Sequence, residues 1–397
     1  MHSLSLILIA CALLIASAQG AVKLYSDSFT TNHNAPLHSF ANGVYIGAAI
    51  NSVSMNDPSV DYIIKNRKDY NMFVAENECK FGQTETTRGV FDFAACDAIF
   101  NFANNLGNSS RFRGHNLVWA DDTYNPSWLT EGGFSTNELY SKGKGSVMEQ
   151  HIVSHIYLFI CFFCLNSIDS PFYFQTTVAG RYKGQTYAWD VVNEALLYND
   201  TTNELSWRTG TWRRDASYSS TEKTYVDYAF QYARAADPKA KLFYNDYGGE
   251  ACGEGKSDAI YRFVQDLKRR GVPIDGVGLQ THIDMNAGYI TQASVGCNIK
   301  RLGMLGLEVH ITELDVTCGS TNVACDQRQQ AYMYQQVLLA CLQYKQYCKA
   351  FLTWGYTDKY SWKSSQNPLT ENAKKEKVAW HEVQAVLRYS GFNLKKF

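Results

Sequence analysis

Trp189-Asp190-Val191-Val192-Asn193-Glu194 and His310-Ile311-Thr312-Glu313-Leu314-Asp315 are the two most informative stretches of this 397-residue chain. Each is an apolar, β-prone run that carries a glutamate where the predicted strand ends. A lone glutamate at a strand end is usually a solvated loop charge. Here Asn193 and Asp315 add a polar group beside each carboxyl group. The two runs therefore predict a pair of carboxylates that act together.

Short β-prone runs followed by helical patterns recur eight times along the chain. The runs are Gly43–Ile50, Asn71–Glu76, Phe112–Trp119, Thr186–Val192, Leu242–Asn245, Gly276–Gln280, Glu308–Thr312 and Ala350–Trp354, with helical patterns such as Asp258–Arg270 and Gln327–Leu342 between them. Eightfold alternation predicts an α/β protein with a single (β/α)8 TIM barrel. The strand C-termini form the catalytic face of such a barrel, and most of these runs end in or beside polar or aromatic residues.

The composition favours neither nucleic acid nor an anionic membrane as a partner. The formal net charge is −1, and no basic cluster stands out. Aromatic residues make up 14% of the chain, which suits a surface that stacks on sugar rings and equally suits an aromatic core. The length is compatible with one α/β barrel, and no linker or solenoid repeat indicates an appended module.

Residues 1–20 have the pattern of a secretory signal peptide. The apolar run Leu4–Ile15 is too short to span a bilayer, and the mostly small residues of Ala16–Gly20 follow it. The alternative is a buried N-terminal strand or helix. We expect cleavage near Gly20 and a secreted, extracellular protein in which the catalytic barrel occupies residues 21–397.

Other kinds of active site find little support in the sequence. His115, His282 and His310 are not spaced as metal-ligand pairs, and no HExxH motif is present. The G-x-S-x-G elbow of ester-cleaving enzymes and glycine-rich phosphate loops are also absent from the sequence. We therefore expect neither a metal nor a cofactor.

The two glutamate runs resemble the signature segments of glycoside hydrolase family 10, the endo-1,4-β-xylanases. The resemblance extends from about Tyr45 to about Tyr389. It includes further blocks in the family's order: Ala75-Glu76-Asn77-Glu78-Cys79-Lys80, Arg113-Gly114-His115-Asn116-Leu117-Val118-Trp119, Asn245-Asp246-Tyr247, Gly278-Leu279-Gln280-Thr281-His282, and Thr353-Trp354-Gly355 through Trp362. One block alone would be weak, whereas the ordered set is highly specific.

The resemblance implies a role for each residue of the expected catalytic centre. Glu194 is expected to be the acid/base and Glu313 the nucleophile, about 5–5.5 Å apart as in retaining glycosidases. Asn193 matches the residue that hydrogen-bonds the sugar 2-hydroxyl. Gln280 is expected near the nucleophile and the same hydroxyl.

Further site residues follow from the same resemblance. His282 and Asp315 match a pair that flanks the nucleophile, although an ordinary structural role is the alternative for His282. For any single tryptophan, a place in the core is the alternative. The expected sugar-binding residues are Glu76, Asn77, Lys80 and His115 as hydroxyl ligands on the non-reducing side, Trp119, Trp354 and Trp362 as aromatic walls there, and Tyr247 as a stacking platform on the reducing side.

The resemblance implies a secreted endo-1,4-β-xylanase that cuts internal bonds of xylan by a retaining double displacement. We expect it to act as a monomer without stable membrane association. Two alternatives remain open: a retaining endo-glycosidase on another β-glucan, such as cellulose, and a catalytically silent glycan-binding protein. Binding alone does not need a paired acid and nucleophile, so the presence of both glutamates argues against the silent protein.

Four positions depart from the usual pattern of the family. Phe81 stands where Trp is common, and Gly82 stands where Asp is common. Ala120 replaces a frequent His, and Gly248 replaces a frequent Asn. These positions edge the expected cleft, so they bear on which sugars bind rather than on the reaction.

Of the 11 cysteines, Cys11 is expected to leave with the signal peptide, and the rest are expected to pair mostly as disulfides in an oxidising compartment. The resemblance implies a bond between Cys341 and Cys348. Cys318 and Cys325 could close a short loop after the second glutamate. Sequence cannot set the connectivity of Cys79, Cys96, Cys252 and Cys297. Asn108 and Asn199 begin glycosylation sequons.

Residues 153–175 interrupt the family pattern. The segment is rich in Phe and Ile and carries one charged residue, Asp169. Without it, four apolar residues fall at i, i+4, i+7 and i+8 on one helical face: Met148, Ile152, Val178 and Ala179. The ends of the segment can be encoded by the usual splice donor and acceptor sequences, so we interpret it as a non-native insert from a retained intron. A genuine hydrophobic loop and a short membrane-touching segment are the alternatives.

Overall fold

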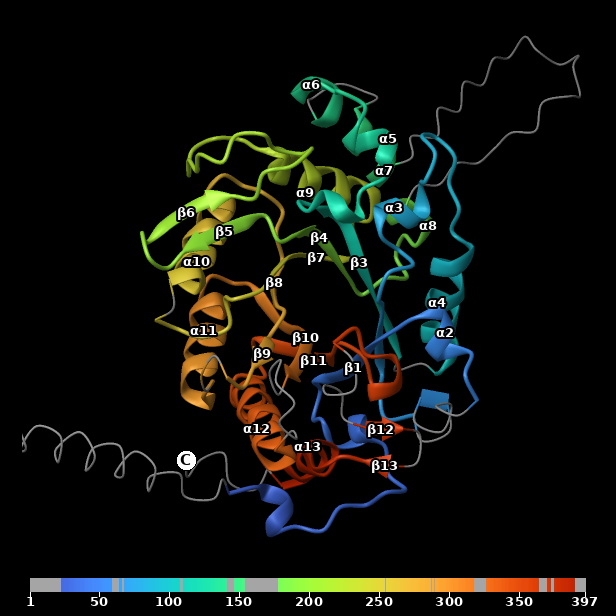
Figure 1. The fold of residues 1–397 in the computed structure, drawn as a ribbon, viewed down its shortest axis with the longest axis vertical. Helices are drawn as coiled ribbons and strands as arrows, with labels where there is room; N and C mark the ends of the chain where they lie inside the picture. The colour runs from blue at the N-terminus through green and yellow to red at the C-terminus, as the bar shows by residue number, and fades with distance from the viewer. Residues whose placement is uncertain are drawn as a thin grey trace, which may run out of the picture.

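A closed ring of parallel strands forms the centre of the molecule (Figure 1). The computed structural model describes residues 23–389 except positions 59–63, 66–67, 108–109, 141–145, 154–177, 254, 287, 289, 318–325, 364–369 and 373–374. The barrel strands are β1 (Tyr45–Ile50), β2 (Met72–Ala75), β3 (Arg111–Trp119), β4 (Ala188–Asn193), β7 (Lys241–Asp246), β8 (Gly276–Leu279), β10 (Glu308–Thr317) and β11 (Cys348–Thr353). β11 pairs with both β1 and β10, which closes the ring and confirms the predicted (β/α)8 barrel.

Helices follow the strands and cover the outside of the ring. Buried residues of α10 (Gly255–Arg269) recur with helical spacing, and the Phe263 ring lies 5.1 Å from the ring of Tyr244 on β7. The predicted helix Gln327–Leu342 corresponds to α12 (Gln327–Gln343). The other helices are α2 (Ser52–Met55), α3 (Phe81–Thr84), α4 (Ala94–Asn105), α5 (Ser127–Thr130), α6 (Thr136–Tyr140), α7 (Val147–Ile152), α8 (Val178–Arg181), α9 (Tyr225–Ala236), α11 (Gln292–Met304) and α13 (Val378–Tyr389), with short 3-10 turns η1 (Tyr25–Asp27), η2 (Leu37–Phe40), η4 (Asp122–Tyr124) and η5 (Asp358–Tyr360).

Further short strands lie outside the ring. β5 (Leu196–Asn199) and β6 (Glu204–Trp207) form an antiparallel pair directly after β4. β9 (His282–Asp284) extends the sheet by pairing in parallel with Asp315–Thr317 of β10. β12 (Thr370–Asn372) and β13 (Lys375–Glu376) form a second antiparallel pair.

The second glutamate lies within its strand, so the prediction that it ends a strand is wrong. The predicted strand stopped at Thr312, whereas β10 continues to Thr317. Leu314 and Val316 are buried, and β9 supplies backbone partners beyond the barrel ring. The first glutamate matches the prediction more closely, because Glu194 directly follows β4.

Three disulfides join described cysteines. Cys341 and Cys348 are bonded, as the resemblance implied. The pairs Cys79–Cys96 and Cys252–Cys297 account for the four cysteines that sequence left unassigned. The suggested Cys318–Cys325 loop lies outside the described residues.

The apolar face that joins α7 and α8 is buried. Met148, Ile152, Val178 and Ala179 are all fully covered. Most of the suspected insert, residues 154–175, lies outside the described residues, as do the signal-peptide positions. Within the described part of the chain, no helix is long and apolar enough to cross a membrane.

Candidate active site

The two glutamates lie at the C-terminal rim of the barrel, on strands that are not sequence neighbours. The Glu194 backbone adopts a left-handed conformation with φ of 55°, and its N–H donates to the Asn245 carbonyl oxygen at 2.9 Å. This turn directs the chain away from β4 into the β5–β6 hairpin. Glu313 is more enclosed, with 6% of its side chain exposed against 14% for Glu194.

Side-chain amides link the two carboxylates. Asn245 Nδ2 donates to Glu313 Oε1 at 2.7 Å, and Gln280 Nε2 donates to Glu194 Oε1 at 3.0 Å. Both amides also donate to Asn193 Oδ1, at 2.8 Å and 3.2 Å. A continuous hydrogen-bond path thus runs from one carboxylate to the other through three strand ends.

His282 and Asp315 lie on the opposite side of Glu313. His282 Nε2 is 3.3 Å from Glu313 Oε2, and its Nδ1 is 3.0 Å from Asp315 Oδ2. Trp362 donates from Nε1 to the same Asp315 oxygen at 2.7 Å. Burial favours neutral His282, but the charges and contacts of Asp315 and Glu313 prevail and raise its pKa to about 10. His282 is therefore a cation at neutral pH.

The environments of the two glutamates push their pKa values apart. Burial alone would raise the pKa of Glu313, but His282 and His115 outweigh it and hold that pKa below its ordinary value. Burial, followed by the negative charge of Asp246, raises the pKa of Glu194 above its ordinary value. One carboxyl is thus suited to remain ionised and the other to hold a proton.

Arg208, at the end of the β5–β6 hairpin, contacts the exposed side of Glu194. Its Nε donates to the Glu194 carbonyl oxygen at 3.0 Å, and its Nη2 lies 3.4 Å from Glu194 Oε2. The same Nη2 donates to the Tyr247 hydroxyl at 2.9 Å. Lys256 Nζ lies 3.5 Å from the centre of the Tyr247 ring, so this expected platform is held by two cations.

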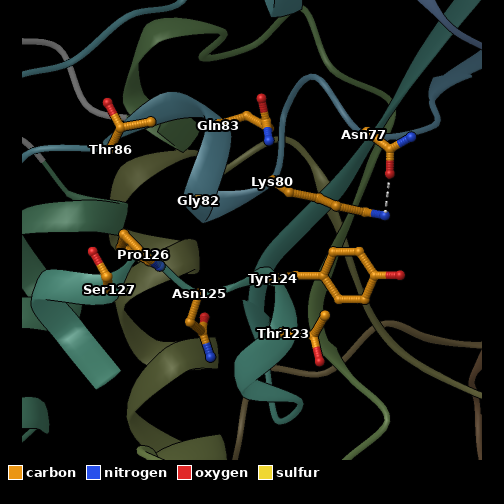
Figure 2. Close-up of a pocket in the computed structure, with 10 residues that line it drawn as sticks. All are labelled: Asn77, Lys80, Gly82, Gln83, Thr86, Thr123, Tyr124, Asn125, Pro126 and Ser127. Atoms are coloured by element: carbon orange, nitrogen blue, oxygen red, sulfur yellow. Dashed lines mark hydrogen bonds between the residues drawn. The ribbon is translucent and has the colours of Figure 1, made fainter. Parts of the chain in front are cut away.

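The residues expected on the non-reducing side gather around Lys80. Lys80 Nζ donates to Asn77 Oδ1 at 2.8 Å (Figure 2). Burial lowers the pKa of Lys80 to about 8, although nearby glutamates act in the opposite direction. Glu76 accepts a hydrogen bond from Asn51 Nδ2 at 2.8 Å, and burial raises its pKa. In this part of the cleft, Lys80 can therefore donate hydrogen bonds and Glu76 can accept them.

Aromatic rings border the same region. The Trp119 ring stacks on Tyr124 at a centroid distance of 4.0 Å, and Lys80 Nζ lies 4.7 Å from the Trp119 ring. Trp354 is 7% exposed and meets the His115 ring edge-on at 5.1 Å. Trp362 is 49% exposed, so it has the most open ring of the expected walls.

The model of glycosyl hydrolase family 10 matches residues 37–167 and 172–386 of this sequence. The chain belongs to glycosyl hydrolase family 10. Its barrel is thus that of a glycoside hydrolase.

Relatives within family 10 are similar over most of this chain. Endo-1,4-β-xylanase B of Neocallimastix patriciarum is 37% identical over 329 residues, which are 82% of this chain and 32% of that protein. Endo-1,4-β-xylanase C of Phanerodontia chrysosporium is 32% identical over 332 residues, covering 83% of this chain and 72% of that protein. The chain thus spans about a third of the first protein's length and most of the second's.

Solved family 10 structures share the fold. Xylanase 10B from Thermotoga petrophila RKU-1, in complex with xylobiose, superposes with a TM-score of 0.72 at 28% identity and covers 91% of this chain and 99% of that one. Native xylanase 10B from Thermotoga maritima gives a TM-score of 0.71 at 28% identity, covering 89% and 98%.

Several residues of this family 10 site were not singled out from the sequence. Asn245 is the penultimate residue of β7 and lies in register with Asn193 at the end of β4, and that parallel could have revealed it. Asp190 lies under His115, whose Nδ1 is 3.0 Å from Asp190 Oδ2, and the buried Arg113 donates to the same carboxylate. Arg208 carried no signal, because it follows an exposed hairpin. Among the described residues, no group of three or more His, Cys, Asp or Glu is placed to hold a metal ion.

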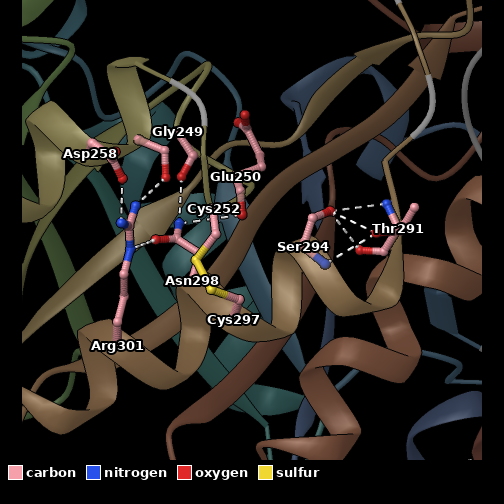
Figure 3. Close-up of a disulfide and its surroundings, with 10 residues drawn as sticks. Gly249, Glu250, Cys252, Asp258, Thr291, Ser294, Cys297, Asn298 and Arg301 are labelled. Carbon is pink, nitrogen blue, oxygen red and sulfur yellow. Dashed lines mark hydrogen bonds and ion pairs between the residues drawn. A yellow bond between two sulfur atoms is a disulfide. The ribbon is translucent and has the colours of Figure 1, made fainter.

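The loop after β7 is tied both to the rim and to an outer helix. Glu250 Oε1 accepts from the Thr281 N–H at 2.9 Å, between the site residues Gln280 and His282. The Cys252–Cys297 disulfide bonds this loop to α11 (Figure 3). Asn298 of α11 also donates to the Gly249 carbonyl oxygen at 2.6 Å. Thr281 has a φ of 65°, a conformation that costs a residue with a Cβ about 1 kcal/mol or more.

Proposed function

We propose that the chain is a secreted endo-1,4-β-xylanase that hydrolyses internal β-1,4-xylosidic bonds with retention of configuration. Glu313 acts as nucleophile and Glu194 as acid/base. The observation that carries the assignment is the opposite direction of the two pKa shifts at one rim. Two carboxyls with separated pKa values supply the two roles that glycoside hydrolysis needs.

The mechanism follows from these environments. Ionised Glu313 attacks the anomeric carbon while protonated Glu194 gives its proton to the departing glycosidic oxygen. The bond to Glu313 forms as the glycosidic bond breaks. In the second step Glu194 removes a proton from water, which attacks the anomeric carbon and releases Glu313. Asn193 Oδ1 accepts hydrogen bonds from the amides of Asn245 and Gln280, which fix the orientation of the Asn193 side chain.

Xylan as substrate is supported by the relatives. The similar proteins of Neocallimastix patriciarum and Phanerodontia chrysosporium are named endo-1,4-β-xylanases, and the Thermotoga petrophila structure holds xylobiose. The residues around Lys80 and the rings of Trp119 and Trp354 provide hydrogen-bonding groups beside flat apolar surfaces, a combination that suits sugar rings.

The substrate is tested by sugar release from xylan, cellulose and mixed-linkage glucan. Xylan should be the preferred polymer, and Glu313→Ala should abolish its hydrolysis while substrate binding persists. Reproducibly faster sugar release from cellulose than from xylan would indicate that the substrate is another β-glucan. Binding of xylan without release of sugar by the parent chain would favour the silent glycan-binding protein.

Retention is tested on the first product. Proton NMR during early hydrolysis should show the β-anomer before mutarotation. Appearance of the α-anomer first would exclude double displacement and would require carboxyls roughly 6.5–9.5 Å apart.

Secretion is proposed on the pattern of residues 1–20. N-terminal sequencing of the protein from the culture medium of its natural host should begin near Ala21. The Asn199 sequon lies on the exposed end of β5, where it is accessible to glycosylation. Recovery of the chain in the cell with Met1 intact would contradict this proposal.

A further inference from the structure

Lys256 is a buried cation at an unfavourable place in the fold. It is the second residue of α10, and 9% of it is exposed. A lysine loses hydration when it is buried, and the N-terminal end of a helix carries partial positive charge, so burial and helix position both disfavour a cation here. The last turn of the same helix carries Lys268 and Arg269, where cations are favourable. The stability of α10 therefore does not explain the position of Lys256.

Asp246 is the counter-ion of Lys256. Lys256 Nζ donates to Asp246 Oδ1 at 2.8 Å, and Asp246 is 1% exposed. The Tyr244 hydroxyl donates to Asp246 Oδ2, and the Tyr247 N–H donates to Oδ1 at 2.9 Å. Asp246 is the last residue of β7, so the ion pair joins the start of α10 to the rim end of that strand.

The Lys256 ammonium group also lies over the ring of Tyr247. Its Nζ is 3.5 Å from the ring centre, well inside the roughly 6 Å reach of a cation–π contact. The lysine stem packs beside the turn that follows, because a Cβ at Gly248 would lie 3.4 Å from Lys256 Cδ. One ammonium group thus contacts both the aromatic ring of Tyr247 and the carboxylate of the residue before it.

Tyr247 lies on the Glu194 side of the site. Its hydroxyl accepts a hydrogen bond from Arg208 Nη2 at 2.9 Å, and the same nitrogen lies 3.4 Å from Glu194 Oε2. The proposed acid gives its proton to the departing oxygen, so groups beside Glu194 face the departing sugar. Tyr247 is partly exposed, which leaves part of its ring available to the apolar face of a sugar.

Two cations fix the Tyr247 side chain at different points. Arg208 binds the hydroxyl, and Lys256 contacts the ring. A ring whose orientation is set before the sugar arrives loses less conformational entropy on binding. Because Lys256 is buried, its effect on a sugar passes through Tyr247.

We propose that Lys256 is a positioning residue for the departing sugar. With Asp246 as its counter-ion, it fixes the Tyr247 ring in the orientation that stacks on the sugar at the reducing side of the cleaved bond. The proposal rests on the function proposed above and deepens it. It also gives a reason for burying a cation at the start of α10.

The test compares two substrates that differ on the reducing side. Linear xylohexaose places sugars there, whereas β-xylobiosyl fluoride releases a fluoride ion that fills no sugar position. Lys256→Met and Lys256→Gln both remove the cation, and the glutamine keeps a hydrogen-bond donor for buried Asp246. In each variant, kcat/KM for xylohexaose divided by kcat/KM for the fluoride should fall about 5- to 20-fold, the loss expected for a desolvated cation–π contact.

Tyr247→Ala separates the positioning role from a merely structural one. The ring is absent in this background, so Lys256→Met should lower the ratio less than about twofold further. Lys268→Met, at an exposed position on the same helix, is the matched control and should keep the ratio of the parent.

Three outcomes would overturn the proposal: an unchanged ratio in both Lys256 variants, the same fall in Lys268→Met, or an undiminished fall in the Tyr247→Ala background. A parent that cleaves both substrates while the Lys256 variants keep its ratio refutes the role of Lys256 alone. A parent inactive on both substrates refutes the proposed function as well.

Discussion

Asn245 donates a 2.7 Å hydrogen bond to Glu313, and this bond joins β7 to the proposed nucleophile. Its amide orientation is set by Thr312, whose hydroxyl donates to Asn245 Oδ1 at 2.7 Å. The donor nitrogen is thereby left to face Glu313 and Asn193. The carboxylate is held from β7, which β8 separates from β10, as well as by the charge of His282.

Asn245→Asp replaces that donor with an acceptor of the same shape. We expect kcat on xylan to fall roughly 10- to 100-fold, because a hydrogen bond to a charged group is lost. The added negative charge should also raise the pKa of Glu313, so the acid limb of the kcat/KM profile should move to higher pH. Asn34→Asp, at an exposed position near the N-terminus, is the control and should match the parent in both measurements.

Glu194→Ala should separate substrates by leaving group. Hydrolysis of xylan requires proton donation to a poor leaving group, so its rate should fall by roughly 10²- to 10⁴-fold. Activated dinitrophenyl xylobiosides need little proton donation, and their glycosylation step should be much less affected. Pre-steady-state measurement of that step distinguishes the cases, since equal losses on both substrates would indicate a structural role.

Arg208→Met should shift the alkaline limb of the pH profile. The Arg208 cation stabilises ionised Glu194 and so opposes the rise in that group's pKa. Without it, Glu194 should keep its proton to higher pH, and the limb should move upward. Arg208→Lys retains the charge and should stay nearer the parent. Movement of the limb to lower pH in Arg208→Met would contradict the assignment of this limb to Glu194.

A chain that lacks residues 153–175 should express in soluble form at higher yield and be the active form. Removal joins Met148 and Ile152 directly to the buried face of Val178 and Ala179, and it deletes apolar surface that favours aggregation when exposed. Sequencing the mature transcript determines the origin of the segment. A message that contains it, together with full-length protein of equal solubility and activity, would show that it belongs to the protein.

The barrel was predictable from sequence because its strands are buried on both sides and read as apolar runs between amphipathic helices. The strand that carries Glu313 was predicted too short, because its extension depends on pairing with β9, a contact between distant segments. Arg208 carried no pattern at all. Its importance comes from the hairpin after β4, whose path only tertiary packing determines.

The loop after β7 connects the catalytic rim of this enzyme to an outer helix. Glu250 and the Cys252–Cys297 disulfide connect the left-handed turn at Thr281, and with it Gln280 and His282, to the outer surface of α11. Substitutions on that helix can therefore alter turnover through Gln280 and His282, although no residue of the helix is expected to bind sugar. In a library of random variants, α11 should therefore yield catalytic defects at positions outside the cleft.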